Sequence, residues 1–236
     1  METIYLLRCR KISIFRQLQI EEALLRADQH NWCLLNEGVE DSIVMGISAK
    51  PKRLLNCPLV KSLKVPVVKR FTGGGTVVVD KNTVFVSFIY NENFLRIPPY
   101  PESVMRWSAD FYQKIFCFSD FSLKENDYVF GDRKFGGNAQ YMRRSRWLHH
   151  TSFLWDFDEK KMSYLLKPEK APSYRQNRSH VEFLCRLRDR FFSKEELLSH
   201  TICELRKIGN VVEVFLEDLD EILSKSHRKS TCFLEI

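Results

Sequence analysis

Apolar side chains recur three or four positions apart in several stretches of the chain, which is the spacing of one helix face. The clearest stretch covers residues 17–29, where Ile20, Ala23, Leu24 and Ala27 would share a face. A second helix is predicted over residues 102–117, with a buried face made of Val104, Trp107, Phe111 and Ile115. Weaker helical patterns cover residues 159–166, 194–208 and 218–226. Helices are therefore expected in both halves of the chain.

Shorter runs rich in β-branched and aromatic residues predict strands between these helices. One lies within the first 16 residues, and the others cover 32–35, 42–47, 65–69, 76–79, 84–90, 128–155 in several pieces, and 211–215. Residues 167–190 are basic and irregular, and we expect them to cross the surface. Because strands and helices are mixed without a regular alternation, we predict an α+β fold, a mixed β-sheet flanked by helices. Residues 1–190 would form the main domain, and residues 191–236 a short C-terminal helical extension packed on it.

The composition is that of a folded protein. Hydrophobic residues make up 44% of the 236 residues, and 18 Phe, 8 Tyr and 4 Trp provide enough apolar surface for a core. No apolar run approaches the roughly 20 residues of a membrane span, so no membrane partner is expected. The net charge of +7 has two interpretations, a basic pI that serves solubility alone or a positive surface that steers anions, acidic protein partners or nucleic acid. Because zinc-ligand spacings and RNA-binding aromatic motifs are absent, nucleic acid is not expected as a partner.

The seven cysteines indicate a reducing compartment. Their number is odd, their spacing is wide, and no C-x-x-C motif occurs. No apolar signal-peptide core precedes a cleavage site, so we expect buried, unpaired thiols in a protein that is not secreted. The first 16 residues are basic enough to be the remnant of a mitochondrial presequence, but their apolar spacing favours a first strand.

Six of the nine glycines fall in two short loops. Gly73, Gly74 and Gly75 form the first group, and Gly131, Gly136 and Gly137 the second. Lys69 and Arg70 precede the first loop, while Arg133 and Lys134 lie inside the second. Exposed backbone N–H groups beside a cation suit a carboxylate or phosphate, so the two loops could form one anion-binding pocket. Each loop alone could equally be a tight hairpin, and neither fits a nucleotide-binding fingerprint.

Three motifs in order resemble those of the lipoate-protein ligase family. Residues 68–80, V-K-R-F-T-G-G-G-T-V-V-V-D, are similar to its R-R-x-x-G-G-G-x-V-x-H-D loop. Asn126-Asp127 and the following G-D-R-K-F-G-G-N-A-Q, residues 131–140, resemble its N-D…G-x-R-K-x-x-G-x-A-Q segment. His149-His150-Thr151 matches its H-H-G-T stretch. The resemblance spans about residues 17–190, and the ordered set is far more specific than any one motif.

The resemblance implies a biotin/lipoate protein ligase catalytic fold, related to class II aminoacyl-tRNA synthetases. It implies that lipoate or octanoate binds in a tunnel floored by the 70–80 loop. It also implies that Lys134 contacts the acyl carbonyl and the activating phosphate. Physical chemistry agrees with that role, because attack on an acyl-adenylate places negative charge on the carbonyl oxygen, and a fixed ammonium stabilises it.

Further site residues follow from matching the motifs position by position. The implied substrate-binding residues are Arg70, Gly73, Gly74, Gly75, Thr76, Asp80, Gly137, Ala139, His149, His150 and Thr151. Asn126, Asp127 and Lys134 would bind the nucleotide or its Mg²⁺, although Asx pairs also form ordinary turns. Strand alternation sends the side chains of His149 and His150 to opposite faces, so a structural role for them stays open. No metal site made by the protein alone is expected.

The chain departs from the family pattern at Val79, where ligases carry His, and at Ser152, which replaces the glycine of H-H-G-T. Only residues 193–236 follow the core, which is shorter than the accessory domain of ligases that make their own adenylate. Two enzyme hypotheses therefore stay open. Lipoyl would come from lipoyl-AMP, preformed or made with ATP and Mg²⁺, or an octanoyl or lipoyl group would come from an acyl-protein through a cysteine. Cys117 is the candidate nucleophile, although its position favours an inert core thiol. A non-catalytic, lipoyl-domain-binding relative is the third hypothesis.

The implied acceptors are lysines on lipoyl domains of 2-oxoacid dehydrogenases and on the glycine-cleavage H-protein. In the family these acceptor proteins are acidic. The basic stretch over residues 133–146 offers a complementary surface; its members are Arg133, Lys134, Arg143, Arg144 and Arg146. We expect a monomer. The family's lipoate metabolism favours the mitochondrial matrix, with the cytoplasm as the alternative.

Overall fold

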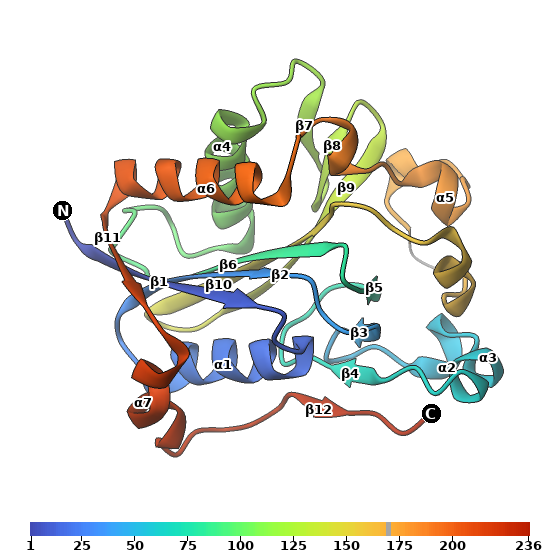
Figure 1. Cartoon of the computed structure of the whole chain (residues 1–236), viewed down its shortest axis with the longest axis horizontal. Coiled ribbons are helices and arrows are strands. Elements are labelled where there is room, and N and C mark those ends of the chain that lie inside the picture. The colour runs from blue at the N-terminus through green and yellow to red at the C-terminus, as the bar shows by residue number, and fades with distance from the viewer. Residues whose placement is uncertain (169–170) are drawn as a thin grey trace.

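The computed structural model describes residues 1–168 and 171–236, and its centre is a mixed eight-stranded sheet (Figure 1). In spatial order its strands are β11 (Asn210–Val214), β1 (Thr3–Arg10), β2 (Asn31–Glu37), β6 (Thr83–Asn91), β10 (Arg146–Leu154), β9 (Arg133–Met142), β8 (Asp127–Phe130) and β7 (Phe121–Lys124). The first three are parallel, and every later neighbour is antiparallel. The predicted mixed sheet is confirmed.

A second, four-stranded sheet carries the first glycine loop. Its order is β12 (Cys232–Phe233), β4 (Val67–Lys69), β3 (Ser42–Met45) and β5 (Val77–Val79). The glycine loop joins β4 to β5, so both of its ends are fixed in the same small sheet.

Three long helices cover the two faces of the large sheet (Figure 1). On one face lies α1 (Ile14–Ala27), and on the other lie α4 (Pro101–Phe116) and α6 (Lys194–Ile208). The predicted first helix begins earlier than expected because Ser13 caps it, with its Oγ accepting the N–H of Arg16 at 3.2 Å. The short helices are α2 (Pro51–Leu54), α3 (Cys57–Ser62), α5 (His180–Phe183) and α7 (Asp220–Ser224). The 3₁₀ turns are η1 (Glu159–Tyr164), η2 (Ser173–Arg175), η3 (Leu187–Asp189) and η4 (Leu216–Leu219).

The C-terminal residues 191–236 contain strands as well as helices. β11 pairs with β1 at one edge of the large sheet, and β12 pairs with β4 in the small one. The tail before β12 is held against α1, because the buried carboxylate of Glu22 accepts the backbone N–H groups of Ser230 and Thr231 at 2.9 and 3.1 Å. Phe233 then stacks on Phe15 with 4.2 Å between ring centroids. A domain boundary at residue 190 stays a prediction.

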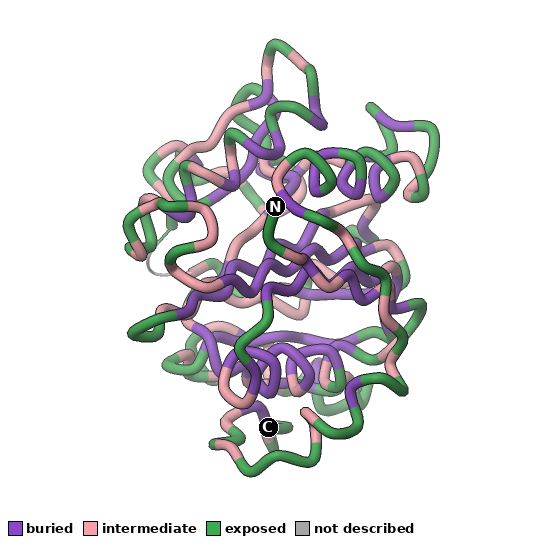
Figure 2. Tube along the Cα trace, turned by 90° about the vertical axis from the view of Figure 1, so that its left-hand side faces the viewer, coloured by how far each residue is buried: buried purple, intermediate pink, exposed green. Residues whose placement is uncertain are grey.

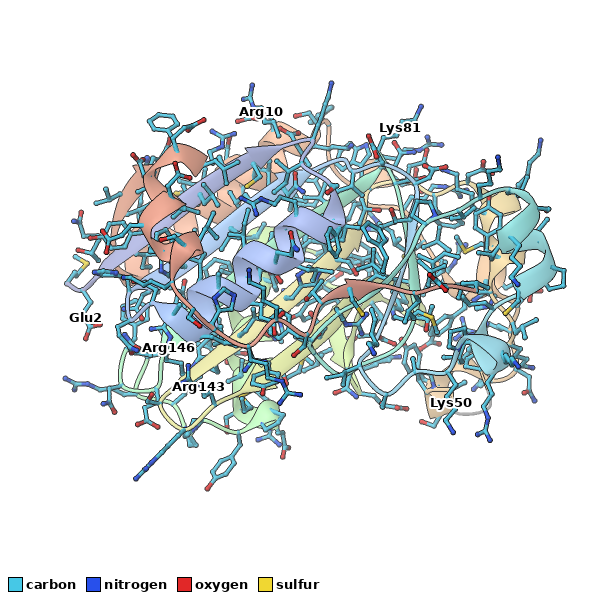
Figure 3. All side chains as sticks on the ribbon, turned by 90° about the horizontal axis from the view of Figure 1, so that it is seen from below. Glu2, Arg10, Lys50, Lys81, Arg143 and Arg146 are labelled. Atoms are coloured by element: carbon cyan, nitrogen blue, oxygen red, sulfur yellow. The ribbon has the colours of Figure 1, made fainter. Side chains whose placement is uncertain are left out.

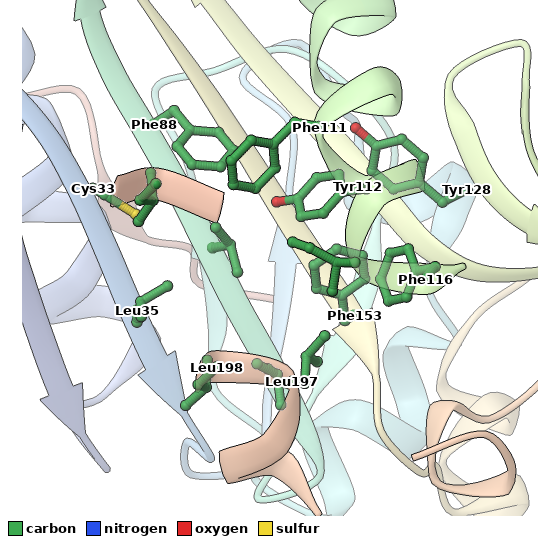
Figure 4. Close-up of a cluster of buried hydrophobic side chains, with 14 of the residues drawn as sticks. Cys33, Leu35, Phe88, Phe111, Tyr112, Phe116, Tyr128, Phe153, Leu197 and Leu198 are labelled. Carbon is green, nitrogen blue, oxygen red and sulfur yellow. The ribbon is translucent and has the colours of Figure 1, made fainter. Parts of the chain in front are cut away.

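An aromatic core fills the space between α4, α6 and the large sheet (Figure 4). Phe116 lies at its centre, fully buried, and its ring lies 5.1 Å from that of Phe135 and 5.6 Å from that of Phe153. Figure 2 shows the buried strands of the sheet running through the middle of the molecule. The predicted inner face of α4 is confirmed for Val104, Phe111 and Ile115, whereas Trp107 is only partly buried. Across the described residues, the structure contains no helix with the length and apolar character that a bilayer span requires.

Phe116→Ala should lower the free energy of unfolding by about 3–5 kcal/mol, because it removes a fully buried ring and leaves a cavity. Urea denaturation followed by circular dichroism measures this loss. Phe192→Ala is the matched control, since that ring is 99% exposed, and it should change stability by less than about 0.5 kcal/mol. Equal losses in the two variants would contradict the packing described here.

Candidate active site

One cavity of about 980 Å³ is lined by both glycine loops. Most of the predicted site residues are on its wall: Arg70, Gly73, Gly74, Gly75, Thr76, Asn126, Asp127, Lys134, Gly137, Ala139 and His150. Asp80, His149 and Thr151 are not. One region of the wall is apolar, with Ile14, Val44, Val79 and Phe85, and another carries Asn126, Asp127, Lys134, Arg175 and His180. A cavity of this size and mixed lining is typical of a small-molecule site.

Arg70 fixes the conformation of the first glycine loop through hydrogen bonds to the loop's carbonyl groups. Its Nε and one terminal nitrogen donate to Gly73 O at 3.1 and 2.8 Å, and the terminal nitrogen also reaches Gly75 O at 2.8 Å. Gly74 has a φ of +100°, and a Cβ there would lie 2.6 Å from that guanidinium nitrogen. Burial lowers the pKa of Arg70 to about 10, opposed by the nearby carboxylate of Glu21, so the group stays charged at neutral pH. Arg70 therefore acts on any ligand mainly through the loop that it fixes.

Lys134 reaches the cavity from the start of β9. Its Nζ lies 2.7 Å from Asp127 Oδ1, and 22% of its side chain is exposed. The pairing of β8 with β9 shifts by one residue here, from Asp127 opposite Gly137 to Val129 opposite Lys134. A Cβ on Gly137 would lie 3.1 Å from Lys134 Nζ, so the absence of a side chain there leaves room for the ammonium. Asp127 is nearly buried, and its other oxygen accepts the phenol O–H of Tyr174 at 2.8 Å.

The backbone of Asn126 is held by Asn138, which also lines the cavity, and Asn138 is in turn held by Thr151, which does not. Asn138 Nδ2 donates to Asn126 O at 3.0 Å, and Asn138 Oδ1 accepts the hydroxyl of Thr151 at 2.7 Å. Thr151 thus holds the turn before Asp127 through Asn138. Sequence reasoning missed Asn138, although it stands inside the second motif.

The two histidines lie on opposite faces of β10, as strand alternation predicted. His150 lines the cavity, and its Nδ1 lies 2.9 Å from Oε1 of the fully buried Glu21. That His150 contact, together with hydrogen bonds from Ser87 and Gln17, lowers the pKa of Glu21 against the effect of its burial. His149 faces the core, where burial lowers its pKa to about 3. Its Nδ1 accepts from Gln140 at 3.0 Å, so it is a neutral structural residue.

Asp80 supports the end of β5 rather than the cavity. Its Oδ2 binds Lys161 Nζ at 2.9 Å, and its Oδ1 accepts the N–H of Asn82 at 2.8 Å. This ion pair joins the small sheet to η1, which also accounts for an acidic residue at the end of the first motif.

Residues 171–186 form a segment, here called the strap, that contributes Ala171, Pro172, Arg175, His180, Phe183 and Leu184 to the cavity wall. The sequence indicated only an irregular basic stretch. Arg175 is buried, with its guanidinium carbon 5.0 Å from the centre of the Phe183 ring, and its Nε donates to Arg178 O at 3.0 Å. Burial and the nearby Arg178 lower its pKa. Composition gave no signal that these cations would be fixed on an aromatic ring.

Two expectations about surface chemistry were wrong. Cys117 is exposed at the end of α4 and lies outside the main cavity, so it is neither a core thiol nor a pocket nucleophile. Of the seven cysteines, all unpaired, only Cys9 and Cys33 are buried. The basic stretch is not one surface either: Arg146 is buried and donates to Asn91 Oδ1 at 2.6 Å and to His30 O at 2.7 Å. Figure 3 shows Arg143 and Arg146 near one end of α1, whereas Arg133 begins the ten-residue strand β9.

The cavity and its motifs agree with a family assignment. The family model described as the lipoyl protein ligase A/B catalytic domain matches residues 13–206, which is most of the chain. The chain belongs to this family, and the predicted family and ligase fold are confirmed.

Two curated relatives are similar to the chain. The chain is 30% identical over 241 aligned positions to "Inactive lipoate--protein ligase 2" of Plasmodium falciparum, covering 77% of this chain and 62% of the relative. It is 27% identical over 214 positions to the lipoate-protein ligase LplJ of Bacillus subtilis, covering 86% and 63%. The chain thus spans a little over three fifths of the length of both relatives.

Solved structures show the same fold at low sequence identity. The bipartite lipoate protein ligase of Thermoplasma acidophilum, described with its E2 lipoyl domain, superposes with a TM-score of 0.78. It is 18% identical, with 94% of this chain and 91% of that chain covered. A lipoate-protein ligase A bound with ATP superposes with a TM-score of 0.76 at 18% identity, covering 94% and 92%.

Arg70→Lys should lower the free energy of unfolding by about 1–3 kcal/mol, since one ammonium cannot replace the fork of bonds that the buried guanidinium donates to the carbonyls of Gly73 and Gly75. Hydrogen exchange of residues 71–76 should speed up, which mass spectrometry measures directly. Lys69→Arg, the reverse exchange at the neighbouring position, should leave both quantities near wild type. Unchanged exchange in Arg70→Lys would show that the loop holds its shape without the guanidinium.

The depressed pKa of His149 predicts a loss of stability as the pH falls. In the unfolded chain the His149 imidazole binds a proton near pH 6.5, whereas in the folded protein it stays neutral down to about pH 3. Below pH 6.5 the free energy of unfolding should therefore fall by up to about 1.4 kcal/mol per pH unit from this residue. Urea unfolding at pH 7 and pH 5 should show a smaller pH-dependent loss in His149→Gln than in wild type. An equal loss would contradict the assignment.

Proposed function

We propose that this chain transfers a lipoyl group from lipoyl-adenylate to the ε-amine of a lysine on an acceptor protein domain. The amine nitrogen bonds to the acyl carbon, the bond from that carbon to the phosphate oxygen breaks, AMP leaves, and the amine's proton passes to solvent. The observation that carries this proposal is the position of Lys134, whose ammonium enters the cavity beside Asp127. A fixed cation at that place stabilises the negative charge that develops on the carbonyl oxygen.

The cavity's two regions support an acyl-adenylate as the ligand. The apolar wall, which includes Ile14, Val44 and Phe85, suits an acyl chain. Val79 keeps this region apolar where the family pattern has a histidine. The region around Asn126, Lys134 and His180 suits the phosphate and nucleoside.

We also propose that the chain itself adenylates free lipoate with ATP. The similarity to a ligase bound with ATP supports this step. Among the described residues, no group of three or more histidine, cysteine or acidic side chains could hold a metal. A Mg²⁺ ion would therefore arrive with the triphosphate, whose charge it would neutralise. Asn126 and Asp127 supply the oxygen donors on this wall that such a hard cation prefers.

The two competing hypotheses differ in their support. A transferase that uses an acyl-protein donor needs a nucleophilic thiol, and no cysteine is among the described residues of the cavity wall. A non-catalytic protein that binds lipoyl domains is the second candidate, favoured by the word "Inactive" in the name of one relative. The retained Lys134, held by an ion pair inside the cavity, favours catalysis.

The acceptors that we propose are lipoyl domains of 2-oxoacid dehydrogenases and the glycine-cleavage H-protein. The E2 lipoyl domain described with one structural neighbour supports this class of partner. Seven unpaired cysteines support a reducing compartment, and we propose the mitochondrial matrix, with the cytoplasm as alternative, for a monomeric enzyme.

Intact-mass spectrometry of an apo H-protein or lipoyl domain tests the proposal. With preformed lipoyl-AMP, the wild-type chain should add one lipoyl mass, and Lys134→Ala should slow the reaction by at least about 100-fold. Lys160→Ala, an exposed lysine of η1, should behave as wild type.

Supplying free lipoate and Mg-ATP in place of lipoyl-AMP tests adenylation separately. A mass gain with both donors identifies a self-sufficient ligase, and a gain with lipoyl-AMP alone identifies a transferase. No gain with either donor, combined with measurable binding of the acceptor domain, would favour the non-catalytic candidate.

A further inference from the structure

We propose that Tyr174 is a positioning residue, whose phenol O–H fixes the carboxylate of Asp127 so that the carboxylate in turn holds the Lys134 ammonium at the cavity wall. The meaning of this contact for catalysis rests on the proposed function. The positioning itself concerns three side chains of this chain and is testable without any reaction.

The carboxylate of Asp127 has one partner on each oxygen. Lys134 Nζ lies 2.7 Å from Oδ1, and the hydroxyl of Tyr174 donates to Oδ2 at 2.8 Å. The terminal torsion of an aspartate is broad and nearly two-fold, so a single partner leaves the carboxylate free to turn. A second donor on the other oxygen removes that freedom, and Oδ1 then stays directed at the ammonium.

The strap places Tyr174 at this point. Ser173 anchors it on one side, since its N–H and hydroxyl both donate to Glu125 Oε1 at 2.7 Å. The ring of Tyr174 packs on Phe183, with 5.2 Å between centroids. Farther along, the N–H of Cys185 donates to Lys134 O at 2.9 Å. The strap therefore contacts the backbone of Lys134 directly and its side chain through Asp127.

The chemistry of a phenol suits this task. A phenol carries its proton at neutral pH, so Tyr174 is a donor to the carboxylate of Asp127. When an anionic phosphate enters the cavity, Lys134 can turn towards it. Asp127 would then keep the Tyr174 hydrogen bond rather than remain a nearly buried charge with no partner. Tyr174 thereby lowers the cost of moving Lys134 from its resting partner to the ligand.

The spectrum of the lysine ammonium groups tests the positioning. In protein labelled with ¹⁵N at lysine Nζ, a held ammonium gives a sharp signal, and the signal missing from Lys134→Arg belongs to Lys134. We expect this signal in wild type, and we expect it to broaden or disappear in Tyr174→Phe, which keeps the ring and its packing. An unchanged Lys134 signal in Tyr174→Phe, or no such signal in wild type, would overturn the proposal.

Two control variants separate the hydroxyl from its surroundings. Tyr5→Phe makes the same chemical change at a residue packed on Trp32, far along the chain from the strap, and should preserve the Lys134 signal. Ser173→Ala removes one anchor of the strap but leaves the phenol, and should also preserve it. Loss of the signal in Ser173→Ala to the same extent as in Tyr174→Phe would mean that the strap as a whole, and not the hydroxyl, holds Lys134.

Single-turnover transfer from lipoyl-AMP measures the consequence for catalysis. The rate in Tyr174→Phe should fall about 10- to 100-fold, as expected for a misplaced catalytic group. The dissociation constant for lipoyl-AMP should rise as well, because the Tyr174 hydroxyl no longer offsets the cost of moving Lys134 from Asp127 to the ligand. If wild type transfers nothing, the proposed function fails while the spectrum still decides the positioning. If wild type transfers and Tyr174→Phe matches it, the catalytic role of Tyr174 is wrong.

Discussion

A one-residue irregularity in the pairing of β8 with β9 determines the geometry of the site. In a regular strand, residues three apart point to opposite faces, so Lys134 and Gly137 would not meet. The register shift between Asp127 and Val129 places an extra residue in β9, and a bulge of this kind turns a side chain to the other face. Lys134 consequently extends over Gly137 to Asp127. The spacing between Lys134 and Gly137 in the second motif therefore includes the extra residue of the bulge.

Arg70 and Lys134, the two cations of the motifs, have different roles because their partners differ. Arg70 is buried, and its guanidinium donates to the carbonyls of Gly73 and Gly75 in the protein's own loop. Lys134 is partly exposed and has one carboxylate, Asp127, that an incoming anion can replace. One charge therefore maintains the shape of the cavity, and the other is available for chemistry. This division is a consequence of burial and donor geometry.

Local patterns predicted the elements better than the roles of individual side chains. Periodicity located α1 and α4, and the three motifs located the family and the glycine loops, Asn126, Asp127 and Lys134 on the cavity wall. Asp80 was misplaced because a motif position does not say whether a carboxylate meets a ligand or a lysine such as Lys161. Arg146 and the strap were missed for a related reason, since burial of a cation depends on distant partners such as Asn91 or Phe183. Those partners are brought together only by the fold.

Because the C-terminal tail that crosses α1 pairs with β4, the glycine loop is fixed only late in folding. β4, which leads directly into that loop, obtains one of its two neighbours from residues 232–233, more than 160 positions later in the chain. Contacts of such separation close large loops and form slowly. During synthesis, the large sheet between β2 and β10 has all of its strands available while the small sheet still lacks an edge. The large sheet is therefore able to form before the glycine loop between β4 and β5 is fixed. In a newly made chain the overall fold then forms before the cavity is complete.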